Sequence, residues 1–412
     1  MRGMTDDMTI GQRVAFYRTR RGMSQEVLAG LVGKTEEWLR KIENDRAPLD
    51  RLSVIRSLAR TLDVTLADLI GEPSLFEWSG ESGSQTIPAL RSALHDYRHL
   101  THRFGVALDD DPPRLDDLRR EVAGVWETYQ VSNYGALARR LPLLIQDCLA
   151  ATRTLDGGDG QQAQALAAYV HQVATLFLTK LGEADLAWIS AGRGLAAANE
   201  SNDHIVIGSV SRTAAHALVS IGEYAQALTL ATGAVDFLGP RMRLRPSPEL
   251  LAVAGSLHLI CAVAAARNDD RGLADEHLRR ASECADKLGV DGNHVWTAFG
   301  PTNVAIHRVT VAMELGDVQR AIKIGPSLDT SALPVERRVR HAIETARALA
   351  RRNMVDEALH QLLTAEQIGA EQVRYHRLSR TIVREFLVRP RPPRLAIELS
   401  ERMGIGARTP RW

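Results

Sequence analysis

The chain has 412 residues, more than one ordinary hydrophobic core holds, so two or more domains are expected. Hydrophobic residues make up 45% of the sequence, charged residues 25% and aromatic residues 5%, a composition that excludes a disordered or collagen-like chain and favours helices. The formal net charge is +1, which excludes a strong overall field attracting the whole protein to nucleic acid, so any DNA binding must come from a local arrangement of charges.

Residues 8–71 have the pattern of a small domain of five short helices. The first helix begins at Ile10, and the residues that end or cap the first three helices are Gly22, Ser24, Gly33 and Thr35. Two further helices are expected, at 51–62 and at 66–70. A second and a third helix joined by a very short turn that contains Gly is the layout of a helix-turn-helix unit.

This stretch resembles the lambda-repressor-like helix-turn-helix family, also called the xenobiotic-response-element type. The resemblance covers all five helices and includes Ser24-Gln25 at the start of the second and Ile42-Glu43-Asn44 at the end of the third. In such domains the second helix crosses the phosphate backbone, and the third helix reaches base edges in the major groove. The resemblance therefore implies a transcription regulator that binds an operator in double-stranded DNA.

The resemblance also assigns DNA contacts to nine residues. Phosphate contacts, which set the register on the duplex, are implied for Gln25, Thr35, Asn44, Arg46 and Arg51. The candidate base readers on the outward face of the third helix are Glu36, Glu37, Arg40 and Lys41. Arg and Lys prefer O6 and N7 of guanine, and Glu accepts from N4 of cytosine, so an operator containing G·C pairs is expected. Alternatively, the two glutamates only complement the helix dipole in the first turn.

The charge of this domain predicts how it assembles on DNA. Residues 1–71 hold 12 basic and 10 acidic side chains, an excess of only two positive charges. One copy should therefore bind weakly and in a salt-sensitive way. A homodimer on two adjacent half-sites is expected.

Residues 72–88 are rich in Gly, Ser and Pro and are predicted to be a linker. From 89 to 408 apolar residues recur at helical spacing without strand alternation of any length, so the whole chain is predicted to be all-α. Around 222–234 the sequence resembles a tetratricopeptide repeat, with Gly222 at the turn, Tyr224 beside it and small residues at Ala227 and Ala234. The same frame recurs with key alanines at Ala187, Ala227, Ala274, Ala321 and Ala358. Their separations of 40, 47, 47 and 37 residues indicate elongated, degenerate repeats.

Stacked helical pairs form an α-solenoid with a concave inner surface. The repeat frame places a polar stripe on that surface, and its candidate ligand-binding residues are Tyr169, Gln172, Arg212, His216, Asn303, Arg340 and Arg347. Asn bonds both N–H and C=O of a bound peptide, and Arg clamps a carboxylate, so a peptide or small-molecule effector is predicted. The alternative is a water-filled groove or an intramolecular contact. Trp296 and Phe299 either add an apolar pocket near Asn303 or pack between repeats.

Other kinds of chemistry have no support in the sequence. There is no GxxxxGK[ST] phosphate loop, no HExxH zinc helix and no GxSxG elbow, so we expect neither an enzyme nor a bound cofactor. The three cysteines, Cys148, Cys261 and Cys284, lack metal-ligand spacing, and the histidines do not cluster, so no metal site is expected. The N-terminus lacks an apolar signal core, and no apolar run reaches membrane-spanning length, so a cytoplasmic protein without membrane contact is expected.

Taken as a whole, the chain resembles the regulators of Gram-positive bacteria that join a helix-turn-helix domain to tetratricopeptide-like repeats. It is predicted to be dimeric, with a DNA-binding domain at 8–71, a linker at 72–88 and a solenoid at 89–408 that senses a ligand and dimerises. A ligand in the solenoid is expected to shift the placement of the DNA-binding domains, because it binds one arrangement better than another. The alternative is a DNA-binding adaptor whose repeats recruit a protein partner and bind no small ligand.

Overall fold

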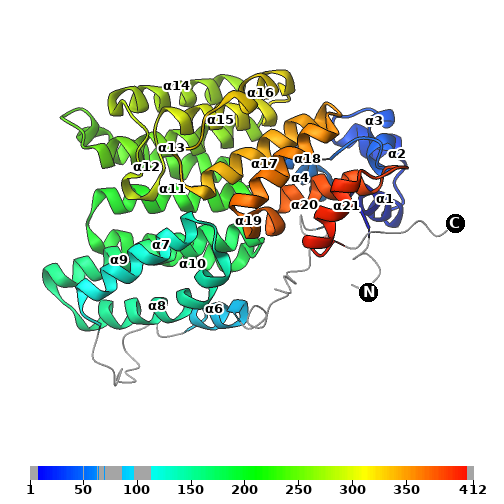
Figure 1. The fold of residues 1–412 in the computed structure, drawn as a ribbon. Coiled ribbons are helices and arrows are strands. Elements are labelled where there is room, and N and C mark those ends of the chain that lie inside the picture. The colour runs from blue at the N-terminus through cyan, green and yellow to red at the C-terminus, as the bar shows by residue number, and fades with distance from the viewer. Residues whose placement is uncertain are drawn as a thin grey trace.

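The computed structural model describes residues 8–49, 51–62, 64, 69, 86–96 and 113–405, and the regular structure of these residues is entirely helical (Figure 1). A small group of helices at the N-terminal end is followed by a long series of antiparallel helical pairs. The predicted fold class, an all-α chain with a helix-turn-helix domain and a tetratricopeptide-like solenoid, is confirmed.

The N-terminal group has α1 (Ile10–Arg20), α2 (Gln25–Leu31), α3 (Glu36–Glu43) and α4 (Leu52–Leu62). Local capping explains their boundaries, because the side chains of Ser24 and Thr35 accept hydrogen bonds from the backbone N–H of Val27 and Trp38. Both predicted turn glycines have φ of +67°, in the left-handed region that favours glycine. The buried core of the group includes Val14, Leu28, Leu39, Ile42 and Leu58. Most of the predicted fifth helix, at 66–70, lies outside the described residues.

The described part of the repeat region contains six helical pairs. They are α7 (Leu115–Gln130) with α8 (Tyr134–Thr154), α9 (Gly157–Leu181) with α10 (Ala184–Ser201), α11 (His204–Ser220) with α12 (Tyr224–Met242), α13 (Pro248–Arg267) with α14 (Arg271–Leu288), α15 (Pro301–Glu314) with α16 (Val318–Ile324), and α17 (Val335–Arg351) with α18 (Val355–Ile368). Three shorter helices follow: α19 (Ala370–Tyr375), α20 (Arg377–Leu387) and α21 (Arg394–Arg402). The five key alanines of the predicted frame are all buried where paired helices meet.

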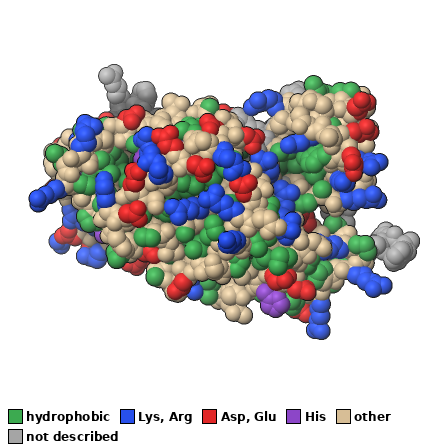
Figure 2. Space-filling model, turned by 90° about the horizontal axis from the view of Figure 1, so that it is seen from above, with side chains coloured by type: hydrophobic (Ala, Val, Ile, Leu, Met, Phe, Trp, Pro, Cys, Tyr) green, Lys and Arg blue, Asp and Glu red, His purple; other side chains and the backbone are tan. Residues whose placement is uncertain are grey.

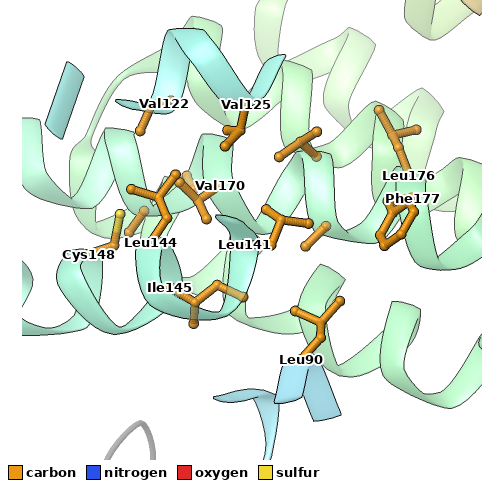
Figure 3. Close-up of a cluster of buried hydrophobic side chains, with 14 of the residues drawn as sticks. Leu90, Val122, Val125, Leu141, Leu144, Ile145, Cys148, Val170, Leu176 and Phe177 are labelled. Atoms are coloured by element: carbon orange, nitrogen blue, oxygen red, sulfur yellow. The ribbon is translucent and has the colours of Figure 1, made fainter. Parts of the chain in front are cut away.

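A helix before the first pair ties the start of the repeat region to its core. The first three residues of this helix, α6 (Thr86–Leu94), fall within the predicted linker, and residues 72–85 lie outside the described residues. Leu90 of α6 is fully buried and points towards Leu141 of α8, in a cluster that also holds Val125 and Phe177 (Figure 3). The repeat region is therefore packed from α6 onwards.

The solenoid curls until its first pair meets its last helices (Figure 1). In the turn between α7 and α8, the hydroxyl of Ser132 donates to the side-chain oxygen of Gln372 at 2.6 Å. In the first turn of α8, the backbone N–H of Gly135 donates to Glu371 at 2.9 Å. Farther along, the ring of Trp126 stacks on that of Trp296 with 5.1 Å between centroids. These contacts close the repeats around an interior space.

Helix α13 lies at the centre of this arrangement. Among the described residues it is the one helix long and apolar enough to span a membrane, with a mean hydropathy of 1.9 in its most apolar stretch. In the fold 94% of that stretch is buried, because α11, α12, α14 and α15 surround the helix. It is the core helix of the repeat region.

Candidate nucleic-acid interface and ligand cavity

The outward face of α3 carries the four predicted base readers. Glu36, Glu37, Arg40 and Lys41 are all exposed, and the ammonium of Lys41 lies 2.9 Å from a carboxylate oxygen of Glu37. Hydrogen bonding and charge from Lys41 hold the pKa of Glu37 below its ordinary value. Acidic and basic side chains are interspersed over this end of the molecule (Figure 2). Lys41 must therefore break its ion pair with Glu37 before it can bind a base or a phosphate.

A buried carboxylate braces this face from behind. Glu43 accepts from Nε of Arg18 at 2.6 Å and from the side-chain amide of Gln25 at 2.7 Å, which ties α1, α2 and α3 together. The hydrogen bond that Arg18 donates to Glu43 raises the pKa of Arg18. Gln25, predicted to bond a phosphate, therefore has its amide held against α3 in this structure. Sequence reasoning named Glu43 only as part of the motif at the end of the third helix and did not assign it Arg18 as a partner, although a glutamate at an inward position of a short helix is the kind of residue that needs a partner.

Of the four remaining phosphate candidates, Thr35 caps α3 by accepting from the backbone N–H of Trp38 at 3.2 Å, and the other three face the repeat region. The side-chain amide of Asn44 donates to the backbone oxygen of Arg40, and both Asn44 and Arg46 border the space between the two parts of the molecule. Arg51 makes an ion pair with Asp269, in the turn between α13 and α14, at 2.5 Å. In this arrangement Arg51 is therefore bound to the solenoid, where it cannot also hold a phosphate.

A cavity of about 1580 Å³ occupies the interior of the curled repeats. Within the helical pairs, the helix that lines the cavity is always the first of its pair, as the repeat frame predicts, and α20 closes part of the cavity. Residues 8–13 and 42–49 of the N-terminal domain also line it. A single cavity is thus bounded by both parts of the chain.

The structure brings five of the seven predicted ligand-binding residues to this cavity: Arg212, His216, Asn303, Arg340 and Arg347. The other two lie outside it. Gln172 is buried and donates to the backbone oxygen of Ser209 at 3.0 Å, which locks α9 to α11. The ring of Tyr169 packs edge-on against Trp296 at 5.1 Å between centroids, so it supports a cavity residue from behind. Phe299 is fully buried against Gly255, which makes it a packing residue between repeats.

The cavity wall carries an excess of positive charge. On α9 to α17 the charged lining residues are six cations, Lys180, Arg212, Arg267, Arg337, Arg340 and Arg347, against three carboxylates, Glu314, Glu336 and Glu344. Lys180 pairs with Glu336 at 2.6 Å and Arg347 with Glu314 at 3.1 Å. Burial alone would raise the pKa of both carboxyls, but their basic partners outweigh it and hold each pKa at about 2. The part of the wall on α9 to α17 therefore has a net charge of +3, from six cations and three carboxylates.

Three cavity histidines, His216, His307 and His376, add no charge near neutral pH. Burial is the main cause that lowers their pKa values, followed by repulsion from nearby arginines, and the pKa of His307 is about 3. Among the described residues no group of three or more His, Cys, Asp or Glu side chains could hold a metal ion. The three cysteines are buried free thiols whose pKa values burial raises.

Comparison with known proteins bears on the N-terminal part. A family described as a helix-turn-helix domain matches residues 9–69. A protein of Bacillus licheniformis, the HTH-type transcriptional regulator SinR, is 28% identical over 85 residues, which are 21% of this chain and 77% of that protein. The crystal structure of Bacillus thuringiensis PlcR in complex with the peptide PapR7 and DNA covers 68% of this chain and 95% of its own, with 13% identity and a TM-score of 0.31. The match to residues 9–69 and the SinR relative confirm the predicted helix-turn-helix domain.

Proposed function

We propose that this chain, whose residues 9–69 are a helix-turn-helix domain, is a cytoplasmic, dimeric transcription regulator whose solenoid binds an effector. The observation that carries the proposal is the shared cavity: residues 8–13 and 42–49 of the DNA-binding domain and the inner helices of the repeats line one space. A ligand that fills this space favours one placement of the two parts over another, because it contacts both. The proposal includes neither catalysis nor a cofactor.

The ion pair between Arg51 and Asp269 indicates the direction of the coupling. Arg51 is a predicted phosphate contact, and in the present arrangement it is held by the repeats. The arrangement with Arg51 paired is therefore proposed as the weaker DNA-binding form. Moving the domain away from Asp269 releases Arg51 for the duplex.

The size of the cavity bears on the class of effector. Sites for small molecules usually measure about 300–1,000 Å³. The cavity, at about 1580 Å³, is larger and accommodates a short peptide or a bulky small molecule. Asn303 and Ser256 on its wall supply the amide and hydroxyl groups that orient such a ligand.

Selection of DNA from a random duplex library by the purified full-length chain tests the function. The intact chain is expected to enrich an inverted repeat with half-sites about one helical turn apart. Reversing both Arg40 and Lys41 to Glu is expected to abolish the enrichment, because these exposed residues lie on the reading face of α3. The matched control reverses Arg279 and Arg280, two adjacent exposed residues of α14 that pair only with glutamates of their own helix, and should retain the enrichment.

Two outcomes would overturn this assignment. Enrichment of the same sequence by the α3 variant would show that α3 does not read the DNA. No enriched sequence, together with a stoichiometric protein partner in the purified sample, would favour an adaptor that binds DNA through that partner.

A further inference from the structure

We propose that the effector is an organic anion with an apolar body, and that its carboxylate or phosphate group binds between Arg212 of α11 and Arg337 of α17. The existence of this site follows from the cavity wall alone. Its regulatory meaning rests on the function proposed above.

Among the six cations of the wall on α9 to α17, pairing singles out these two arginines. Lys180 has Glu336, Arg340 has Glu344 at 2.6 Å, and Arg267 and Arg347 share Glu314. The guanidinium of Arg212 instead donates to the hydroxyl of its neighbour Thr213 at 3.2 Å. Nε of Arg337 lies 3.7 Å from Glu336, beyond hydrogen-bonding distance. Among the described residues, no carboxylate accepts a hydrogen bond from either of them.

Unsatisfied polar atoms lie on the same wall. Nε of Arg212 and Nε of Arg337 are buried without a hydrogen-bond partner, and so are Nδ1 of His216, Oγ of Ser256 and Oδ1 of Asn303. Arg212 and Arg337 line the same cavity; burial lowers the pKa of Arg212 to about 10, and repulsion from Arg337 adds to the shift. Two half-buried like charges, each with a buried donor that lacks a partner, are costly unless an anion joins them. An oxyanion accepts from both guanidiniums in the geometry that they favour.

The rest of the wall defines the body of the ligand. Leu259, Ile260 and Val263 of α13 face the cavity together with Ile306 of α15, and Trp296 adds an aromatic ring. Apolar surface beside a charged clamp fits a molecule that is charged at one end and hydrophobic along its length. Inorganic ions would leave this apolar surface uncovered.

Two fluorescent probes test the charge requirement directly. 8-Anilinonaphthalene-1-sulfonate is an apolar anion, and N-phenyl-1-naphthylamine is closely similar but lacks the sulfonate. The full-length chain should bind the anionic probe at one site. Arg212→Gln and Arg337→Gln should each weaken that binding at least ~10-fold, since each removes a charge-assisted hydrogen bond. Binding of the neutral probe should stay within about twofold, and Arg279→Gln on the outer face of α14 should change neither.

Thermal unfolding separates a binding role from a structural one. Arg212→Gln removes a half-buried charge without a carboxylate partner, so the ligand-free variant should melt at the same temperature as the parent chain or higher. Unchanged affinity for the anionic probe in both glutamine variants would overturn the proposal. A parallel loss of both probes, or failure of both variants to fold, would show that the arginines are structural and would overturn it as well.

Competition identifies the anionic group and keeps this proposal separate from the function. Displacement of the sulfonate probe by decanoate indicates a carboxylate ligand, displacement by decyl phosphate indicates a phosphate ligand, and displacement by neither contradicts the proposal. If DNA selection fails while the charge-dependent probe binding holds, the proposed function is wrong and the anion site stands. If DNA selection succeeds but probe binding does not depend on the two arginines, the proposed function stands and the proposed anion site is wrong.

Discussion

Removing the charge of Asp269 should release the DNA-binding domain from the repeats. The side chain of Asp269 is 69% exposed and that of Arg51 is 22% exposed, so the ion pair between them is worth about 0.2–1 kcal/mol. Loss of that energy changes the ratio of docked to released domain by a factor of roughly 1.4–5. Asp269 has φ of +60°, a left-handed conformation that Asn tolerates well, so Asp269→Asn removes the charge without straining the turn.

DNA affinity measured by fluorescence anisotropy on the selected operator reports the release. Asp269→Asn is expected to bind about 1.4–5-fold more tightly at low salt, and the gain should fade as salt screens the ion pair. Asp286→Asn, on an exposed residue of α14, changes the net charge by the same amount and is the matched control. Equal gains in the two variants would mean a general charge effect, and no gain in Asp269→Asn would refute the docking argument.

Further predictions concern stability. The pKa values of the cavity histidines in the folded chain lie below 6.5, their ordinary value in the unfolded chain. As the pH falls below 6.5, these histidines therefore bind protons in the unfolded chain before they do so in the folded chain, which favours unfolding. Their stabilising contribution is complete above pH 6.5 and is lost as the pH falls towards their folded-state pKa values. The melting temperature should drop by about 5 °C or more between pH 6.5 and 5, and a flat profile would contradict the burial of neutral imidazoles. Gly255→Ala should lower the free energy of unfolding by about 1–3 kcal/mol in denaturant titrations, because the new Cβ would lie 2.0 Å from the ring of Phe299. Gly272→Ala on the open side of α14 is its control and should cost nothing. Glu336→Gln leaves Lys180 buried without its carboxylate and should destabilise the chain by about 3–5 kcal/mol, whereas a loss below 1 kcal/mol would show that water reaches the pair.

Local signals predicted the helices and their ends. Ser24 and Thr35 cap helices as expected because a capping side chain bonds to backbone within three residues of itself. The turn at Gly222, with φ of +84°, follows from the residue that such a conformation requires. The repeat frame also brought its predicted residues on α11, α15 and α17 to the cavity, since helical periodicity defines one inward face, but not those on α9.

Contacts between distant residues had no such signal. Arg51 and Asp269 are 218 positions apart, and Ser132 and Gln372 are 240 apart, so neither pair follows from any local pattern. Gln172 was expected in the cavity but bonds to α11, because a small rotation of a helix moves a residue from the open face to a helix contact. The excess of cations on the wall became visible only when the curled repeats brought α9, α11 and α17 together.

The affinity of the sulfonate probe for the chain, measured with and without saturating operator DNA, tests most directly whether the cavity and the DNA-binding face are coupled. Because residues 8–13 and 42–49 form part of the cavity wall, movement of their domain onto DNA should change the dissociation constant of the probe, and the probe should change operator affinity by the same factor. A scrambled duplex of equal length should have a much smaller effect. An unchanged probe affinity with operator bound would contradict the account, because it would mean that the two sites act independently.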